Sequence, residues 1–315
     1  MGITAQSAPS NHKALWQHYL GPFQLALMGY VVVATDYAGL GIGKDTDGKE
    51  ILHEYMASPA HANDVVYSVQ AARKAFRELS KKWVVIGHSQ GGGSAWAVAQ
   101  RQAVEPQDGY LGAVAVAPVI AALDYEGPSK AILGSGILSG INAAFPDLDL
   151  KEVLSPYGLR SLETIRDQGM VLASTLTLLV GGQFLQDDWS EHKILQEWQR
   201  LTRNGGKEIR GPMLVVHGEK DATLDISITT RALEETANAC PQSRLEYVRL
   251  RGVTHNTALT AGMRVTMDWI EDRFQGVEVP KGLKVTDPKP ARIESAYQPE
   301  INWFVSPNEG FWNAP

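Results

Sequence analysis

The sequence predicts an α/β fold: a mostly parallel, doubly wound sheet with an inserted helical cap. Short runs of β-forming residues alternate with helical segments in both halves of the chain, and this alternation is typical of parallel sheets with right-handed crossovers. The run at 30–35 is apolar on both faces, as expected for a strand buried inside a parallel sheet. From about 120 to 210 the strand pattern stops and helical periodicity continues alone, which predicts the cap.

The elements can be assigned in chain order. Helices are expected at 11–29, at 60–80, from Gln90 onward and at 258–275. Buried strands are expected at 30–35, 83–87, 111–117, 213–218 and 245–248. We therefore divide the chain into a sheet-bearing core at 1–119 and 211–280, the helical cap at 120–210, and an irregular C-terminal tail at 281–315.

Composition and charge limit the classes of function. The 315 residues are 44% hydrophobic and 20% charged, which suffices for a sizeable buried core. The formal net charge of −6 provides no basic surplus for binding nucleic acid. The single cysteine, Cys240, excludes an internal disulfide, and the sequence has no N-glycosylation acceptor, signal peptide or membrane-spanning apolar run. These features favour the cytoplasm, whereas a longer native N-terminus would favour secretion.

A serine nucleophile is indicated by Gly87-His88-Ser89-Gln90-Gly91, which matches the pattern G-x-S-x-G. The pattern alone is weak, but here it follows a buried strand and opens a helix of small residues, as a nucleophile elbow must. We expect glycine at 87 and 91 because a Cβ would clash in the sharp turn. The turn presents Ser89 at the carboxyl edge of the sheet, where doubly wound folds bind ligands.

A general base and an acid that orients it should follow the serine in chain order. His255 lies in a loop between the last strand and the last helix, so we predict that it is the base. His217, the other histidine after the cap, lies inside a strand. Asp221 follows that strand and is the predicted acid, with Glu219 and Asp225 as the competing carboxylates.

The oxyanion that forms on nucleophilic attack needs two backbone N–H donors. One is predicted at Gln90, directly after the nucleophile. The second is expected near Gly2, where the sequence leaves the donor undefined. This chemistry requires no metal and no organic cofactor.

Four polar residues outside this set have structural interpretations. His88 is expected to pack at the elbow or to form a pocket wall. Asp36 is expected to fix the turn at 39–41. His53 and His61 lack the spacing of metal ligands and are expected to be solvated or packed.

Four stretches of the sequence carry a resemblance to a known family. They are YVVVATDYAGLG at 30–41, GHSQGGG at 87–93, HGEKD at 217–221 and GVTHN at 252–256. Together they resemble the fungal and bacterial secretory lipases within the α/β-hydrolase superfamily, and the first two are fairly specific to that family. The resemblance extends over most of 10–275. It implies hydrolysis of carboxylic esters, often acylglycerols, with Ser89, Asp221 and His255 on the triad positions and with the cap forming an acyl-binding tunnel.

The same resemblance implies strands that this sequence does not contain. Relatives carry a further N-terminal segment with the first three strands, which ends in an oxyanion loop. The third of these strands would lie between 30–35 and 83–87. We therefore expect unpaired edges on both of those segments.

Three functions fit the sequence. The first is a serine ester hydrolase acting on a small acyl ester or a lipid. The second is a peptidase or amidase of the same fold, because bond preference depends on the pocket and the cap. The third is an inactive binder, because one oxyanion donor is undefined. Oligomeric state and acyl-chain length are not specified by the sequence.

Overall fold

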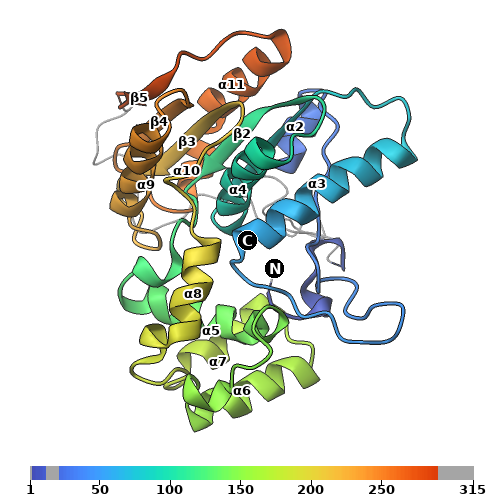
Figure 1. The fold of residues 1–315 in the computed structure, drawn as a ribbon, viewed down its shortest axis with the longest axis vertical. Coiled ribbons are helices and arrows are strands. Elements are labelled where there is room, and N and C mark those ends of the chain that lie inside the picture. Colours follow the sequence, from blue (N-terminus) through green and yellow to red (C-terminus); the bar gives the residue numbers. More distant parts are fainter. Residues whose placement is uncertain (1, 12–20, 290–315) are drawn as a thin grey trace, which may run out of the picture.

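The computed structural model describes residues 2–11 and 21–289, and its core is a parallel sheet with helices around it (Figure 1). The described residues form five strands in the order β1-β2-β3-β4-β5, and each neighbouring pair is parallel. In chain order they are β1 (Trp83–His88), β2 (Tyr110–Val116), β3 (Pro212–Gly218), β4 (Arg244–Leu250) and β5 (Gly282–Thr286). The arrangement confirms the predicted α/β class with a parallel sheet.

The central strands β2 and β3 are buried on both faces, as their uninterrupted apolar runs predict. Ala115 and Val215 belong to one apolar cluster, whereas Val116 and Val216 belong to another. Successive side chains of a strand point to opposite faces, so the two clusters lie on the two faces of the sheet. Because His88 pairs with Val116, the carboxyl ends of β1 and β2 meet at the same edge.

Helices cover both faces of the sheet. The first cluster includes buried residues of α3 (Ser58–Ala75), α4 (Gln90–Val104) and α9 (Ile226–Ala239). The second includes buried residues of α2 (Pro22–Leu27), α10 (Thr257–Ala261) and α11 (Met263–Gln275). The sheet is therefore doubly wound.

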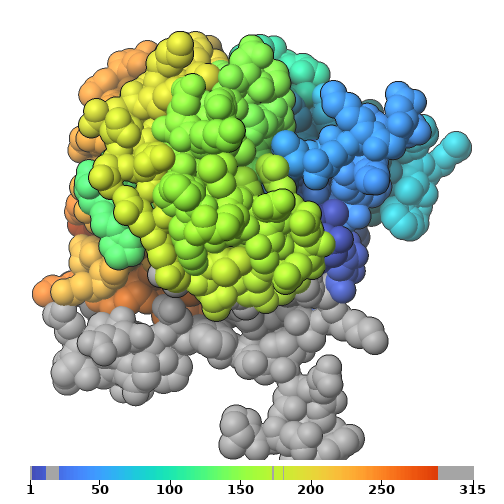
Figure 2. Space-filling model, turned by 90° about the horizontal axis from the view of Figure 1, so that it is seen from below, coloured from blue at the N-terminus to red at the C-terminus, as the bar shows by residue number. Residues whose placement is uncertain are grey.

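Four α-helices lie between β2 and β3 in the sequence and form a separate helical layer beyond one end of the sheet, in the lower half of the view (Figure 1). They are α5 (Gly127–Gly140), α6 (Pro156–Asp167), α7 (Leu172–Val180) and α8 (Lys193–Thr202). Seen from below, this segment covers much of the visible face (Figure 2). Its fully buried residues, among them Leu138, Leu154 and Leu195, join the same apolar cluster as the sheet.

Short 3-10 turns connect several of these elements. In the described part of the chain they are Ala5–Ser7, Pro9–Asn11, Ala122–Asp124, Ile141–Ala143, Leu150–Glu152 and Trp189–Glu191. No helix among the described residues is long and apolar enough to cross a membrane.

The prediction of a buried strand at 30–35 is wrong. These residues are not assigned to any strand, and Val31 and Val33 are 71% and 42% exposed. β1 is the edge strand of the sheet in the described residues, so no paired neighbour holds the 30–35 run in place. Apolar composition made the run resemble a buried strand, but without a partner strand it stays outside the sheet and its valines stay exposed.

Two further elements differ from expectation. The irregular tail was expected from 281, but Gly282–Thr286 form β5, paired with β4; residues 290–315 lie outside the described residues. The helix expected at 258–275 is divided at Gly262 into α10 and α11. A Cβ at Gly262 would lie 2.7 Å from Cγ1 of Val216, so glycine allows the helix pair to approach the sheet there. Of the helix expected at 11–29, only α2 falls within the described residues, since 12–20 lie outside them.

Candidate active site

The serine elbow connects β1 to α4 with a strained backbone. Ser89 has φ 58° and ψ −117°, in a region that non-glycine residues rarely occupy. Its backbone is fixed by hydrogen bonds: its N–H donates to the carbonyl of Val116 at 2.9 Å, and its own carbonyl accepts from Val119 and Gly93. The sequence is thus folded into the turn that a nucleophile elbow requires.

The glycines of the elbow do not all have the predicted role. A Cβ at Gly87 would lie 2.0 Å from the carbonyl oxygen of Gly91, so Gly87 is sterically required. The same prediction is wrong for Gly91, where a Cβ would meet nothing closer than the Tyr37 hydroxyl at 4.0 Å. Beyond the predicted pair, Gly92 is also sterically required, because a Cβ there would lie 2.7 Å from the carbonyl oxygen of Val116. The G-x-S-x-G pattern does not include this residue.

Asp221 and His255 come together at the carboxyl ends of β3 and β4. Nδ1 of His255 lies 2.7 Å from Oδ2 of Asp221. Oδ1 of Asp221 accepts from the backbone N–H groups of Thr223 and Leu224 at 2.9 and 2.8 Å. The Asp221 side chain has no exposed surface, so this carboxylate is buried and fully hydrogen-bonded.

The electrostatics of Asp221 favour the charged form. Burial raises the pKa of its carboxyl, but the hydrogen bonds from His217 and His255 outweigh burial and hold the pKa well below its usual range. The competing carboxylates are placed differently: Glu219 is exposed, and Asp225 is exposed and caps α9 by accepting from the Ser227 N–H. Of these three carboxylates, only Asp221 forms a hydrogen bond with His255.

His88 connects the elbow to the loop that carries His255. Its Nε2 lies 3.1 Å from the carbonyl oxygen of His255, and the two rings are 4.7 Å apart between centroids. Burial and the neighbouring His255 lower the pKa of His88 to about 3. His88 is therefore neutral and donates Nε2–H to that carbonyl. Because Ser89 directly follows His88, this contact holds the serine turn beside the His255 loop.

Gln90 is the first residue of α4, so its backbone N–H has no intrahelical acceptor and lies at the positive end of the helix dipole. Such a group suits an anion that forms at the elbow. The expected second donor near Gly2 stays a prediction. The N-terminal segment is attached to the helical layer, where Oγ1 of Thr4 donates to the carbonyl of Met170 at 3.1 Å.

The Gln90 side chain lies beside a buried group that sequence reasoning missed. Its Nε2 is 3.5 Å from Nε2 of His53 and 3.5 Å from Nε2 of His61. Tyr37 stacks on His61 with 4.3 Å between ring centroids, and its hydroxyl contacts Oγ of Ser94 at 3.1 Å. Of the two expectations for these histidines, packing is the one that the structure confirms. No local sequence signal identifies the group, because it is assembled from separate segments.

Both histidines of this group are neutral. Burial lowers the pKa of His53 to about 4, and burial together with the neighbouring His53 lowers the pKa of His61 to about 3. Nδ1 of His53 lies 3.0 Å from the carbonyl oxygen of Ala38 and donates to it. The Nε2 atom of His53 is then free to accept from an N–H bond of the Gln90 amide.

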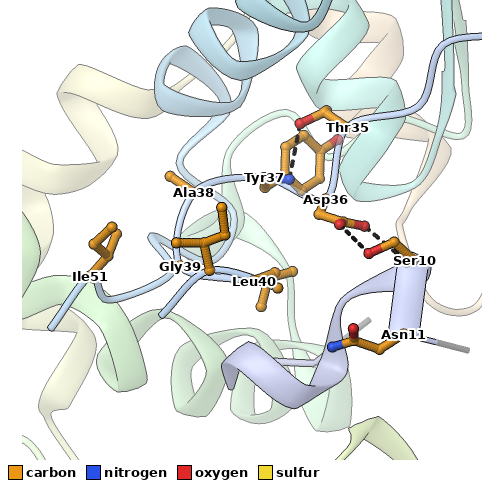
Figure 3. Close-up of a pocket in the computed structure, with 11 residues that line it drawn as sticks. Ser10, Asn11, Thr35, Asp36, Tyr37, Ala38, Gly39, Leu40 and Ile51 are labelled. Atoms are coloured by element: carbon orange, nitrogen blue, oxygen red, sulfur yellow. Dashed lines mark hydrogen bonds between the residues drawn. The ribbon is translucent and has the colours of Figure 1, made fainter. Parts of the chain in front are cut away.

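A separate hollow of about 580 Å³ lies over the 35–42 loop (Figure 3). Residues 35–42, Ser10, Asn11 and Ile51 line it. Among them, Oδ1 of Asp36 accepts from the Ser10 N–H at 3.0 Å, and its Oδ2 accepts from the Ser10 hydroxyl. Asp36 therefore binds the N-terminal segment and does not fix the turn at 39–41 by itself. None of Ser89, Asp221 and His255 lines this hollow. Within the described ranges, no group of three or more histidine, cysteine or acidic side chains could hold a metal ion.

The fold and the elbow define the class of this protein as an α/β hydrolase. The profile of the secretory lipase family matches residues 23–282, and the chain belongs to that family. It is accordingly a hydrolase of the lipase and esterase type. Family membership does not support the predicted cytoplasmic location.

Solved structures show the same fold. Lipase A of Candida antarctica in its closed state superimposes with a TM-score of 0.73 and 17% identity, over 93% of this chain and 72% of that one. A hydrolase from Legionella pneumophila gives a TM-score of 0.69 and 16% identity, over 88% and 78% of the two chains. The rice cell wall degrading esterase LipA of Xanthomonas oryzae gives 0.57 and 17%, over 76% and 69%. No curated protein sequence matches the chain.

Proposed function

We propose that this protein is a serine carboxylic-ester hydrolase that acts on acyl esters or acylglycerols through Ser89, Asp221 and His255. The observation that carries the proposal is the contact of 2.7 Å between His255 Nδ1 and a buried, charged Asp221. The proposal is supported further by His88, which donates to the His255 carbonyl and directly precedes the serine of the strained elbow. A buried carboxylate on one imidazole nitrogen leaves the other nitrogen as the base.

The reaction follows from these positions. His255 donates Nδ1–H to Asp221, so its Nε2 carries the lone pair that removes the proton from Ser89. Oγ of Ser89 then attacks the ester carbonyl, and the resulting oxyanion accepts from the Gln90 backbone N–H, with the second donor proposed near Gly2. Collapse of the intermediate breaks the ester bond, and His255 protonates the leaving alcohol. Water, deprotonated by His255, releases the carboxylic acid from the acyl-enzyme in the same way.

The helical layer at 120–210 is proposed as the cap that binds the acyl chain. It lies between β2 and β3 in the sequence and shares one apolar cluster with the sheet. Apolar side chains at the edge of the sheet suit a fatty acyl group, whose transfer from water is favourable. The description of the family as secretory favours export, and we propose that the protein is secreted.

A fluorophosphonate probe tests the proposed nucleophile directly. The purified 315-residue protein should be labelled covalently, and the Ser89→Ala variant should not. The matched control is Ser94→Ala, since Ser94 lies in the same helix and contacts Tyr37; its labelling should persist. A folded protein that is not labelled, shown by a cooperative melting transition, would favour the inactive binder instead.

The bond preference needs a second assay. Hydrolysis of nitrophenyl esters of rising acyl length should proceed, and the preferred length should report the depth of the cap. Aminoacyl anilides should not be cleaved. Faster cleavage of anilides than of esters would favour the peptidase or amidase that the fold also permits.

A further inference from the structure

His217 is a buried residue that the proposed reaction does not use. It lies in β3, one residue before the end of the strand, and its side chain has no exposed surface. Its Nε2 is 3.0 Å from Oδ2 of Asp221 and 3.1 Å from the carbonyl oxygen of Leu224. Its Nδ1 is 3.1 Å from Oγ1 of Thr229, a fully buried residue of α9.

These partners determine which ring nitrogen carries the proton. Nε2 faces a carboxylate and a carbonyl, which are acceptors only, so it must donate. Nδ1 faces the Thr229 hydroxyl, which can donate to it. The neutral imidazole with its proton on Nε2 therefore satisfies every contact of His217, and no other tautomer of the neutral ring does.

Two histidines thus donate to the same oxygen of the proposed acid. Oδ2 of Asp221 accepts from His255 and His217, while Oδ1 accepts from two backbone N–H groups. Four donors fill the acceptor sites of one carboxylate. The carboxylate cannot rotate about its terminal bond without breaking several of these hydrogen bonds.

We propose that His217 is a positioning residue for the acid of the triad, holding Oδ2 of Asp221 toward His255 and sharing the charge of that oxygen. The proposal rests on the proposed function of Ser89, Asp221 and His255. Because His217 is buried behind Asp221, it does not touch the substrate. Its loss should lower kcat and leave KM nearly unchanged.

The loss of the His217 donor should also change the protonation of the base, His255. Without the His217 donor, more negative charge remains on Oδ2, so the protonated form of His255 is better stabilised. The acid limb of the kcat/KM profile, where protonation of the base stops the reaction, should then move to higher pH. A residue that only filled space would not move this limb.

Other titratable groups near the pair do not account for such a shift. Besides His255, the groups that interact with His217 or Asp221 include His88 of β1, Tyr125 after the turn at 122–124, and Asp225 before α9. Burial and His255 lower the pKa of His88 to about 3, and burial raises the pKa of Tyr125. Backbone and side-chain hydrogen bonds from Ser227 lower the pKa of Asp225. The acid limb therefore reports on His255.

The test compares His217→Leu, which removes the donor at similar volume, with His217→Gln, whose amide nitrogen can occupy the position of Nε2. Both are measured for kcat, KM and the pH profile on a nitrophenyl ester. For the leucine variant we expect kcat to fall about tenfold or more, since a hydrogen bond to a charged group is lost. We also expect its acid limb to move to higher pH. The glutamine variant should recover most of kcat and the position of the limb.

The outcomes separate this proposal from the proposed function. If Ser89→Ala keeps its activity, the proposed function fails before His217 is considered. If Ser89→Ala is inactive while a folded His217→Leu protein has the kcat and acid limb of the wild type, the positioning role is overturned and the function stands.

If His217→Leu does not fold, the variant Thr229→Val tests the positioning role of His217 instead. It removes the hydroxyl that donates to Nδ1 of His217, which weakens Nε2–H as a donor to Asp221, and leaves the ring in place. A smaller shift of the acid limb in the same direction is expected. An unmoved limb in this folded variant would overturn the proposal.

Discussion

Two apolar runs of similar composition have opposite surroundings in this molecule. Residues 213–216 of β3 are all at most 1% exposed, whereas Val31, Val32 and Val33 are 71%, 36% and 42% exposed. The first run has a strand on each side, and the second is in no strand of the described residues. Apolar and β-branched residues thus allow a run to form a strand, but the run is buried only when it pairs within the sheet.

The same contrast applies to the site. The part built on β3 and β4 holds Asp221 and His255 with short hydrogen bonds on fully paired strands. The part built on the segments at 2–11 and 30–42 holds Tyr37 and Asp36 through loops and turns, without a strand. Catalysis needs a fixed geometry, so we expect it to depend mainly on the part built on β3 and β4. The following predictions test this.

The largest expected effect is a loss of kcat at the buried Asp221 that its exposed neighbour Asp225 does not share. Asp221→Asn should lower kcat by about 10⁴-fold, because an amide cannot hold the imidazole in the required tautomer. Asp225→Asn is the matched control, since Asp225 is exposed and caps α9. It should lose little activity. Equal losses in both variants, measured on the same ester, would contradict the assignment of Asp221.

The elbow glycines should differ strongly in their tolerance of alanine. Gly87→Ala should cost about 3 kcal/mol or more of folding free energy, because the new Cβ would meet the Gly91 carbonyl oxygen at 2.0 Å. Gly91→Ala should be neutral or stabilising by up to about 1 kcal/mol, since its Cβ enters open space within a helix. Urea unfolding of the two variants measures the difference.

A Gly91→Ala protein as unstable as Gly87→Ala would contradict this geometry. It would mean that the first turn of α4 is packed more tightly than the distance of 4.0 Å to the Tyr37 hydroxyl allows. Activity is not needed for the comparison, so it remains valid even if both variants are poor enzymes.

Acid should destabilise the two parts of the site in different pH ranges. The pKa of His61 is lowered from 6.5 to about 3, so the unfolded chain binds a proton that the folded one does not. Stability is therefore lost as the pH falls below about 6.5, at about 3 kcal/mol or less for this residue. The lowered pKa of Asp221 acts in the other range: its stabilisation is present above about pH 4 and is lost only below it.

Urea unfolding between about pH 7 and pH 4 separates these contributions. His61→Gln should flatten the dependence of stability on pH in this range. Asp221→Asn should lower the stability at every pH in the range without flattening the slope, because it removes the carboxylate that favours the protonated form of His255. An unchanged slope in the His61 variant would show that this histidine is not neutral in the folded protein.

The sequence predicts the parts of the fold that depend on local pattern. β1, β2 and β3 could be predicted because each contains a continuous apolar run, and β4 could be predicted from the apolar residues of 245–248, which only Glu246 interrupts. Ser89, Asp221 and His255 are predicted because each follows a strand end in a fixed order, and their catalytic roles stay a prediction. β5 was missed because its residues are half-exposed or exposed and their pattern is short. The contacts of His217, His53 and His61 could not be predicted, since each joins residues from separate segments that only the folded chain brings together.

The smallest expected effect compares one valine from each of the two apolar runs, β3 and 30–35. Val215→Ala should cost about 2 kcal/mol, because the residue is fully buried between β2 and β4 and its loss leaves a cavity. Val31→Ala removes the same atoms from a side chain that is 71% exposed, so its cost should be below about 0.5 kcal/mol. Equal costs by urea unfolding would mean that Val31 is packed against something in solution. The run at 30–35 would then be an interface, and the cost should depend on protein concentration if a second copy of the chain supplies the contact.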